Sequence, residues 1–169
     1  MTNRLLRILK HRWWDETDTH KALRPDAVAR IEARVKASER AHTGEIRVCV
    51  EAGLPLSYLW RGLSPRDRAI TMFGKLRVWD TEHNNGVLIY LLLAEHAIEI
   101  VADRGLNAHV GPERWHELVA GMREAFRAGR FEAGLNEAVD AVHALLSQHF
   151  PLAQGQRNPN ELPDRPLLR

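Results

Sequence analysis

The longest apolar run of the chain, Gly86 to Ala94, is the feature that most restricts its fold. It reads Gly-Val-Leu-Ile-Tyr-Leu-Leu-Leu-Ala, with neither a charged residue nor an alternation of polar and apolar positions. Such a run is typical of a strand at the centre of a sheet that is covered on both faces. It is much shorter than the roughly eighteen residues that a membrane-spanning helix needs. The run therefore predicts a central strand in a layered domain and no transmembrane segment.

Two more strands are predicted next to this one. Glu45 to Glu51 alternates strictly, which indicates a strand with one dry face and one wetter face that carries Glu45, Arg47, Cys49 and Glu51. Ala97 to Ala102 follows the central run after only two residues, and so short a connection permits only an antiparallel hairpin. The sheet is therefore predicted to be mixed.

Helical patterns surround these strands and predict a mixed α/β domain. A first helix is expected from about Arg24 to Ala41, and another begins at Pro65 after the capping residue Ser64 and ends near Trp79. The buried side of this second helix is expected to carry Ala69, Ile70, Phe73 and Leu76. Two amphipathic helices follow, one from Trp115 to Phe126 that Gly129 ends and one from Phe131 to Leu146.

Composition divides the chain into three parts. Residues 1–23 form a basic segment, residues 24–151 form the α/β domain, and residues 152–169 form a proline-rich tail that is expected to lie extended on the surface or to be disordered. The basic segment lacks the unbroken apolar stretch of a secretory signal. It is expected to be a short helix docked on its own domain, and the alternative is contact with an anionic membrane surface.

Charge and cysteine usage exclude some classes of partner. The 24 Lys and Arg residues nearly balance the 22 Asp and Glu residues, which argues against a nucleic-acid partner. The single cysteine cannot form an internal disulfide and fits a reducing compartment, so we expect a cytoplasmic protein. The nine histidines show no metalloprotease spacing, so no zinc site is predicted.

The order of the strands predicts a polar rim at one end of the sheet. A right-handed parallel crossover would set the start of the first strand beside the start of the second, and the hairpin would return the end of the third strand to the same edge. We therefore expect one candidate ligand-binding site, made of Glu45, Asn84, Asn85, Asp103 and Arg104. The alternative interpretation is that these are turn residues without a ligand.

Three groups of residues resemble one protein family, the TPM domain family. They are the asparagine-glycine strand Asn85 to Tyr90, the third strand with its continuation Ile98 to Leu106, and the late aromatic and glycine positions Phe126, Gly129, Phe131, Gly134 and Leu135. The resemblance covers about Arg24 to Pro151 and is strongest to the short soluble bacterial branch. It implies a three-layer α/β/α sandwich with a small mixed central sheet. It implies no established activity for that branch.

The resemblance also implies a function for these rim residues, and this chain departs from the family pattern at two places. Family members credited with calcium binding or phosphatase activity carry an aspartate directly before the asparagine-glycine pair, where this chain has Asn84. Their glycine-aromatic-glycine becomes Asp103, Arg104 and Gly105, which supplies a carboxylate nearby. An amide in place of a carboxylate weakens a site for a hard cation.

Three functions follow as hypotheses, and no catalytic residue is assigned. The leading one is a binding module of assembly or regulation, which takes a polar ligand, a cation or a protein partner at the rim. The second is a weak acid phosphatase-like hydrolase. In it Asp103 and Glu45, with Asp80 or Glu82, would hold calcium or magnesium and Arg104 would steady the phosphate. The third is an adaptor that contacts a membrane surface through its basic N-terminal segment. The apolar loop Leu54 to Leu63 is a candidate partner patch, although packing onto the sheet also explains it.

Overall fold

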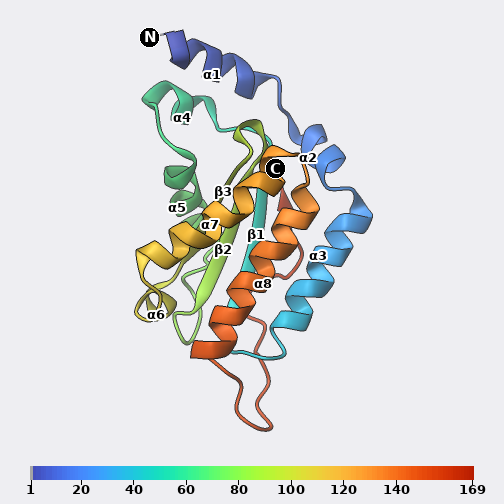
Figure 1. The fold of residues 1–169 in the computed structure, drawn as a ribbon, viewed down its shortest axis with the longest axis vertical. Helices are drawn as coiled ribbons and strands as arrows, with labels where there is room; N and C mark the ends of the chain where they lie inside the picture. The colour runs from blue at the N-terminus through green and yellow to red at the C-terminus, as the bar shows by residue number, and fades with distance from the viewer. Residues whose placement is uncertain (1) are drawn as a thin grey trace.

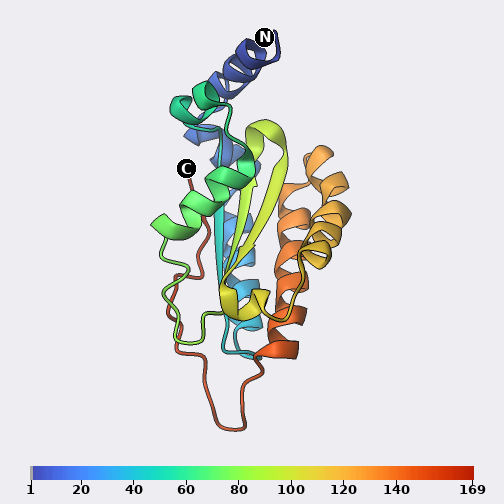
Figure 2. The ribbon, with the colours of Figure 1, turned by 90° about the vertical axis from the view of Figure 1, so that its left-hand side faces the viewer.

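The computed structural model describes residues 2–169, with side chains from residue 4 onward, and it is a three-layer α/β/α sandwich (Figures 1 and 2). Its four-stranded sheet has the order β3-β2-β1-β4. The strands are β1 (Glu45–Glu51), β2 (Gly86–Leu92), β3 (Ala97–Ala102) and β4 (Leu167–Leu168). The predicted fold class is confirmed.

Strand pairing follows the predicted routing. β1 and β2 are parallel, with Glu45 opposite Gly86, and β2 and β3 are antiparallel, with Val87 opposite Ala102. A single 3-10 turn, Leu93–Glu95, and His96 in the left-handed region at φ 49° close the hairpin. All seven residues of β2 are buried, as its uniformly apolar sequence predicts.

The helices α3, α7 and α8 cover one face of the sheet (Figure 2). They span Pro25–Ser38, Pro112–Arg127 and Phe131–His149. Between α7 and α8, Gly129 takes φ +71°, a conformation that costs a residue with a side chain more. Gly134 lets α8 approach Phe126, because a Cβ there would lie 2.6 Å from its ring. A short helix, α6 (Arg104–Asn107), leads from β3 toward α7.

The opposite face is covered by α4 (Leu56–Arg61), α5 (Pro65–Lys75) and the C-terminal tail. Ser64 and Asp67 form the capping box that starts α5. The prediction that Ile70 is buried is wrong, since its side chain is 53% exposed. The buried positions of this helix are instead Arg68, Ala69 and Met72.

Arg68 is buried because it neutralises a carboxylate of the sheet. Its Nε and Nη2 atoms donate to the two oxygens of Glu51 at 2.8 and 2.6 Å. The hydroxyl of Tyr90 donates to the same carboxylate at 2.8 Å. A buried ion pair of this geometry is stable only while all its partners are present.

The C-terminal tail is extended and lies along β1. The prediction that one face of β1 is wetter is wrong, because the tail covers that face. Leu167 and Leu168 pair with Cys49 and Val50 as a fourth, parallel strand. Arg47 donates to the main-chain oxygens of Pro163, at 2.9 Å, and Arg165. All seven residues of β1 are consequently buried.

The N-terminal segment forms two helices, α1 (Thr2–Arg12) and α2 (Glu16–Ala22). The first lies beside α4 and contacts it at one end of the molecule (Figure 1). Within residues 2–169 no helix has the length and apolar character needed to cross a bilayer.

Removing the guanidinium of Arg68 tests the buried ion pair. We expect Arg68→Met to lower the free energy of unfolding by about 3–5 kcal/mol, because the Glu51 charge stays buried without its partner. Denaturant unfolding measures the change. The matched control is Arg34→Met, which breaks an exposed pair with Asp140 and is expected to cost at most about 1 kcal/mol. Equal losses in both variants would contradict this assignment.

Candidate functional site

The structure brings the five predicted rim residues to one end of the sheet, around Gly86. Glu45 lies opposite Gly86 in the β1 and β2 register, and Asn84 and Asn85 directly precede it in the chain. The main-chain nitrogen of Asp103 donates to the Gly86 oxygen at 2.9 Å. We call these five residues, Glu45, Asn84, Asn85, Asp103 and Arg104, the rim.

Close backbone approaches fix the shape of the rim. A side chain on Gly86 would overlap the main-chain oxygen of Val78, and one on Gly105 would overlap the oxygens of His83 and Asn84. The nitrogen of Gly105 donates to the Asn84 oxygen at 2.8 Å. Asn84 itself has φ 51°, which asparagine tolerates better than most residues.

Arg104 is engaged within the rim. Its Nε and Nη2 atoms both donate to the Asn84 side-chain oxygen, at 3.1 and 2.9 Å. Asp103 caps the short helix α6 through a 2.7 Å bond from the Arg104 nitrogen to its Oδ1 atom. The second oxygen of Asp103 takes no part in this cap.

Three buried oxygens of the rim have no hydrogen-bond partner among the described residues. They are Glu45 Oε1, Asn85 Oδ1 and Asp103 Oδ2. The Asn85 amide nitrogen is occupied, since it donates to Thr43 Oγ1 at 3.0 Å. A buried acceptor without a donor costs roughly 1–3 kcal/mol. Each of these oxygens lacks a donor in its own surroundings, since Glu45 faces the tail at Leu162 and Asn85 faces Thr43.

Glu45 differs from its neighbours because the tail covers it. The Leu162 nitrogen donates to Glu45 Oε2 at 3.1 Å, and the side chain is fully buried. Burial raises the pKa of Glu45 to about 7, and the carboxylates of Glu161 and Asp164 add to the rise. The tail therefore limits the access of a ligand to this carboxylate.

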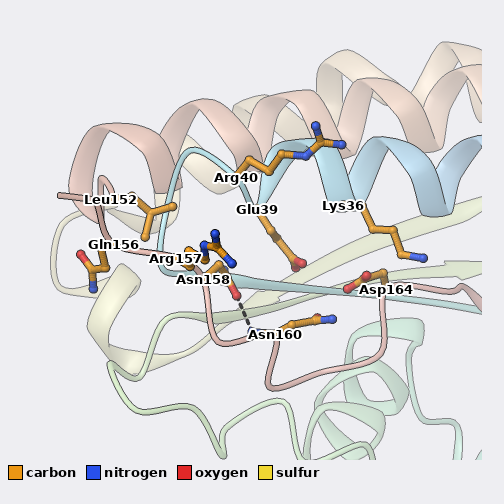
Figure 3. A pocket seen from close by; sticks show the side chains of 9 residues that line it. All are labelled: Lys36, Glu39, Arg40, Leu152, Gln156, Arg157, Asn158, Asn160 and Asp164. Atoms are coloured by element: carbon orange, nitrogen blue, oxygen red, sulfur yellow. Dashed lines mark hydrogen bonds between the residues drawn. The ribbon is translucent and has the colours of Figure 1, made fainter. Parts of the chain in front are cut away.

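A cavity of about 360 Å³ lies between the tail and the C-terminal end of α3 (Figure 3). Its wall includes Glu39, Asn158, Asn160 and Asp164, with Lys36 at one side. Asn158 holds the tail in place by donating to the oxygens of His42 and Gly44, both at 3.0 Å. With its amide nitrogen facing the tail, Asn160 donates to Asp164 Oδ1 at 2.9 Å.

Glu39 lies in this wall as a second buried carboxyl group. Its Oε1 atom accepts from the Ile46 nitrogen at 2.9 Å, and only 5% of the residue is exposed. Burial raises the pKa of Glu39 to about 9, and the nearby charges of Glu45 and Asp164 act in the same direction. Sequence reasoning missed Glu39 and Asp164, because only the folded tail brings residues 125 positions apart together.

Asp80 and Glu82, the further ligands of the hydrolase hypothesis, are not among the residues gathered at the rim. Asp80 pairs with Arg77 at 2.6 Å, and the Glu82 nitrogen donates to Glu161 Oε1 at 3.1 Å. Both side chains lie on the surface. In the part of the chain whose side chains are described, no three His, Cys, Asp or Glu residues are grouped so as to hold a metal ion.

Fold and site together define a mixed α/β domain with an acceptor-rich rim at the start of two parallel strands. The model of the TPM domain family matches residues 17–145. The chain therefore belongs to the TPM domain family. No curated protein matches it significantly.

Solved structures agree with this assignment. The BA42 protein of the psychrophilic bacterium Bizionia argentinensis has a TM-score of 0.73 and 26% identity, over 86% of this chain and 94% of that one. The N-terminal domain of a P. gingivalis protein has a TM-score of 0.59 and 21% identity, over 76% of this chain and 79% of that one. The second likeness shows the fold alone.

The carboxyl group of Glu39 makes stability depend on pH. Its folded pKa lies above the ordinary value of 4.5, so the unfolded chain loses this proton first and the group destabilises the fold progressively as pH rises. We expect Glu39→Gln, which keeps an acceptor for Ile46, to be at least about 1 kcal/mol more stable than the wild type near pH 8, with no advantage near pH 4. Denaturant unfolding across this range measures the difference.

The control for this measurement is Glu117→Gln, at an exposed carboxylate that pairs with Arg114. Its difference from the wild type is expected to stay within about 0.5 kcal/mol throughout. A Glu39→Gln advantage that does not change with pH would contradict the raised pKa.

Proposed function

We propose that this chain is a binding module of assembly or regulation whose rim takes an electropositive ligand, calcium or magnesium in the simplest case. The observation that carries the proposal is the set of three buried oxygens around Gly86 that lack a donor. Two belong to carboxylates and one to an amide, the hard oxygen ligands that both cations prefer. A cation bound by one or two of these oxygens would complete its coordination shell with water, which is usual for magnesium.

The tail gives such a site a means of regulation. Glu45 contributes one oxygen to the rim and accepts the Leu162 nitrogen with the other. A cation at the rim favours the ionised form of Glu45, whose pKa burial raises to about 7. Occupancy of the rim and the attachment of the tail are therefore coupled through one carboxylate. Such coupling suits a module that reports a ligand to a protein partner.

Hydrolysis of phosphate esters has less support. The unpartnered atoms of the rim are all acceptors, which repel a phosphate rather than hold it. Arg104, the residue proposed to steady the phosphate, already donates twice to Asn84. The hydrolase would therefore need a rearranged rim, whereas the binding module uses the rim as it stands.

A cation titration tests the proposal. We expect millimolar calcium or magnesium to raise the thermal midpoint relative to sodium chloride of equal ionic strength, because a ligand bound only by the folded state stabilises it. Each kcal/mol of binding corresponds to about 2–4 °C for a domain of this size. Asp103→Asn is expected to abolish the rise, and the control Asp140→Asn, at an exposed carboxylate on α8, is expected to preserve it.

Two results would refute the cation site: no rise with either metal, or an equal rise in Asp103→Asn. Hydrolysis of a chromogenic phosphate ester that disappears in Asp103→Asn would support the hydrolase instead. The same activity in both proteins would identify a contaminant.

The family's aspartate can be restored at position 84. Asn84→Asp alone is expected to leave cation affinity nearly unchanged, because Arg104 already faces that side chain and would neutralise the new carboxylate. The double variant Asn84→Asp with Arg104→Ala is expected to bind calcium at least about tenfold more tightly than the wild type. Isothermal titration measures both affinities, and Arg104→Ala alone is the control. Equal affinities in the double variant and this control would contradict the expected role of the restored carboxylate.

A further inference from the structure

Helix α1 turns most of its apolar side chains away from the protein, whereas Ile8 packs against the core. Leu5, Leu6 and Leu9 are 67%, 59% and 56% exposed, and Trp13, just after the helix, is 85% exposed. These positions recur three or four residues apart and form one stripe. A surface helix normally directs such a stripe to the core. The orientation of α1 is therefore the reverse of the usual one.

Polar contacts hold the helix in this orientation. Arg7 pairs with Glu95 at 2.7 Å, and His11 Nε2 lies 2.8 Å from the same carboxylate. His11 Nδ1 accepts from the Leu54 nitrogen at 2.9 Å, so the ring proton lies on Nε2 and is donated to Glu95. His11 is 4% exposed. Rotating the apolar stripe inward would break these bonds and leave the buried main-chain nitrogen of Leu54 without an acceptor.

The neighbouring helix α4 also carries exposed apolar side chains. Leu56 and Trp60, four residues apart, are 58% and 70% exposed. The two helices pack together at the end of the molecule that carries the ends of β1 and β2 (Figure 1). We call this surface the apolar cap, and it consists of Leu5, Leu6, Leu9, Trp13, Leu56 and Trp60.

Basic side chains accompany the apolar cap. Arg4, Lys10, Arg12 and Arg61 are exposed on the same two helices or next to them. Residues 2–14 and 54–63 contain no acidic residue, although the exposed Asp15 and Glu16 follow directly after the first of these segments. An apolar surface of leucine and tryptophan with positive neighbours matches the interface of an anionic bilayer, where apolar groups enter the headgroup boundary and cations meet phosphates.

We propose that the apolar cap docks this domain on the surface of an anionic membrane. A second copy of the chain fits the cap less well, because a two-fold interface brings the same patch of both copies together and sets like charges against one another. The docking uses two helices from separate parts of the chain. It is independent of the cation site at the rim, which lies at the opposite end of β1 and β2.

Vesicle sedimentation of the full chain tests the proposal. We expect binding to vesicles of mixed phosphatidylglycerol and phosphatidylcholine, and at least about tenfold weaker binding to phosphatidylcholine alone. The double variant Trp13→Ser with Trp60→Ser is expected to lose at least about tenfold in affinity for the anionic vesicles. The matched control is Trp79→Ser, because Trp79 is 49% exposed and follows α5 near the rim.

Charge variants and a rim variant separate the alternatives. Lys10→Glu with Arg12→Glu is expected to weaken anionic binding by at least about twentyfold, from roughly fivefold for each basic residue lost. Asp103→Asn is expected to bind vesicles like the wild type, so that a failed cation site leaves this test unaffected. Circular dichroism confirms that each variant is folded.

Three outcomes would overturn the proposal. The first is equal binding to anionic and neutral vesicles, and the second is unchanged binding of the Trp13 and Trp60 variant. The third is a concentration-dependent dimer, seen by light scattering and abolished by that variant, in a chain that does not bind vesicles. This last result would assign the apolar cap to a second copy.

Discussion

The parallel pairing of β1 with β2, in the register that sets Glu45 opposite Gly86, is the constraint on which the rest of the structure depends. It requires glycine at position 86, because the main chain at Val78 passes too close for a side chain. From this pairing, the hairpin brings Asp103 back to the same point. The polar rim is therefore a result of backbone packing, and its side chains inherit their proximity from the sheet.

Covering the second face of β1 presents a separate physical problem. That face carries Glu45, Arg47 and Glu51, and burying charges without partners is costly. Each has a different solution: Glu51 meets Arg68, Arg47 meets main-chain oxygens of the tail, and Glu45 meets the Leu162 nitrogen. The tail is thus held by polar bonds as much as by apolar contact, and it completes the sheet as a fourth strand.

Local sequence patterns predicted most of this fold. The bounds of β1, the hairpin and the N-cap at Ser64 follow from alternation, connection length and capping chemistry, which act over a few residues. The burial of Arg68 in place of Ile70 does not, because it depends on Glu51 in another element. The position of the tail against the sheet does not follow from local patterns either. Its proline-rich composition indicates a surface segment, although three of its leucines pack on the domain. The strand topology predicted that the rim residues lie at one end of the sheet. Which of their oxygens lack a hydrogen-bond donor could be seen only in the structure.

The reversed orientation of α1 has a consequence for the geometry of the whole domain. The surface made by α1 and α4 lies beyond the last residues of β1 and β2, and the acceptor oxygens lie at their first residues. Seven-residue strands separate the two by roughly 20 Å. A bilayer that held the first surface would leave the end of the domain that carries the rim on the side of the aqueous phase. The parallel strands would then act as a rigid spacer that holds a soluble ligand or partner at a distance from the lipid headgroups.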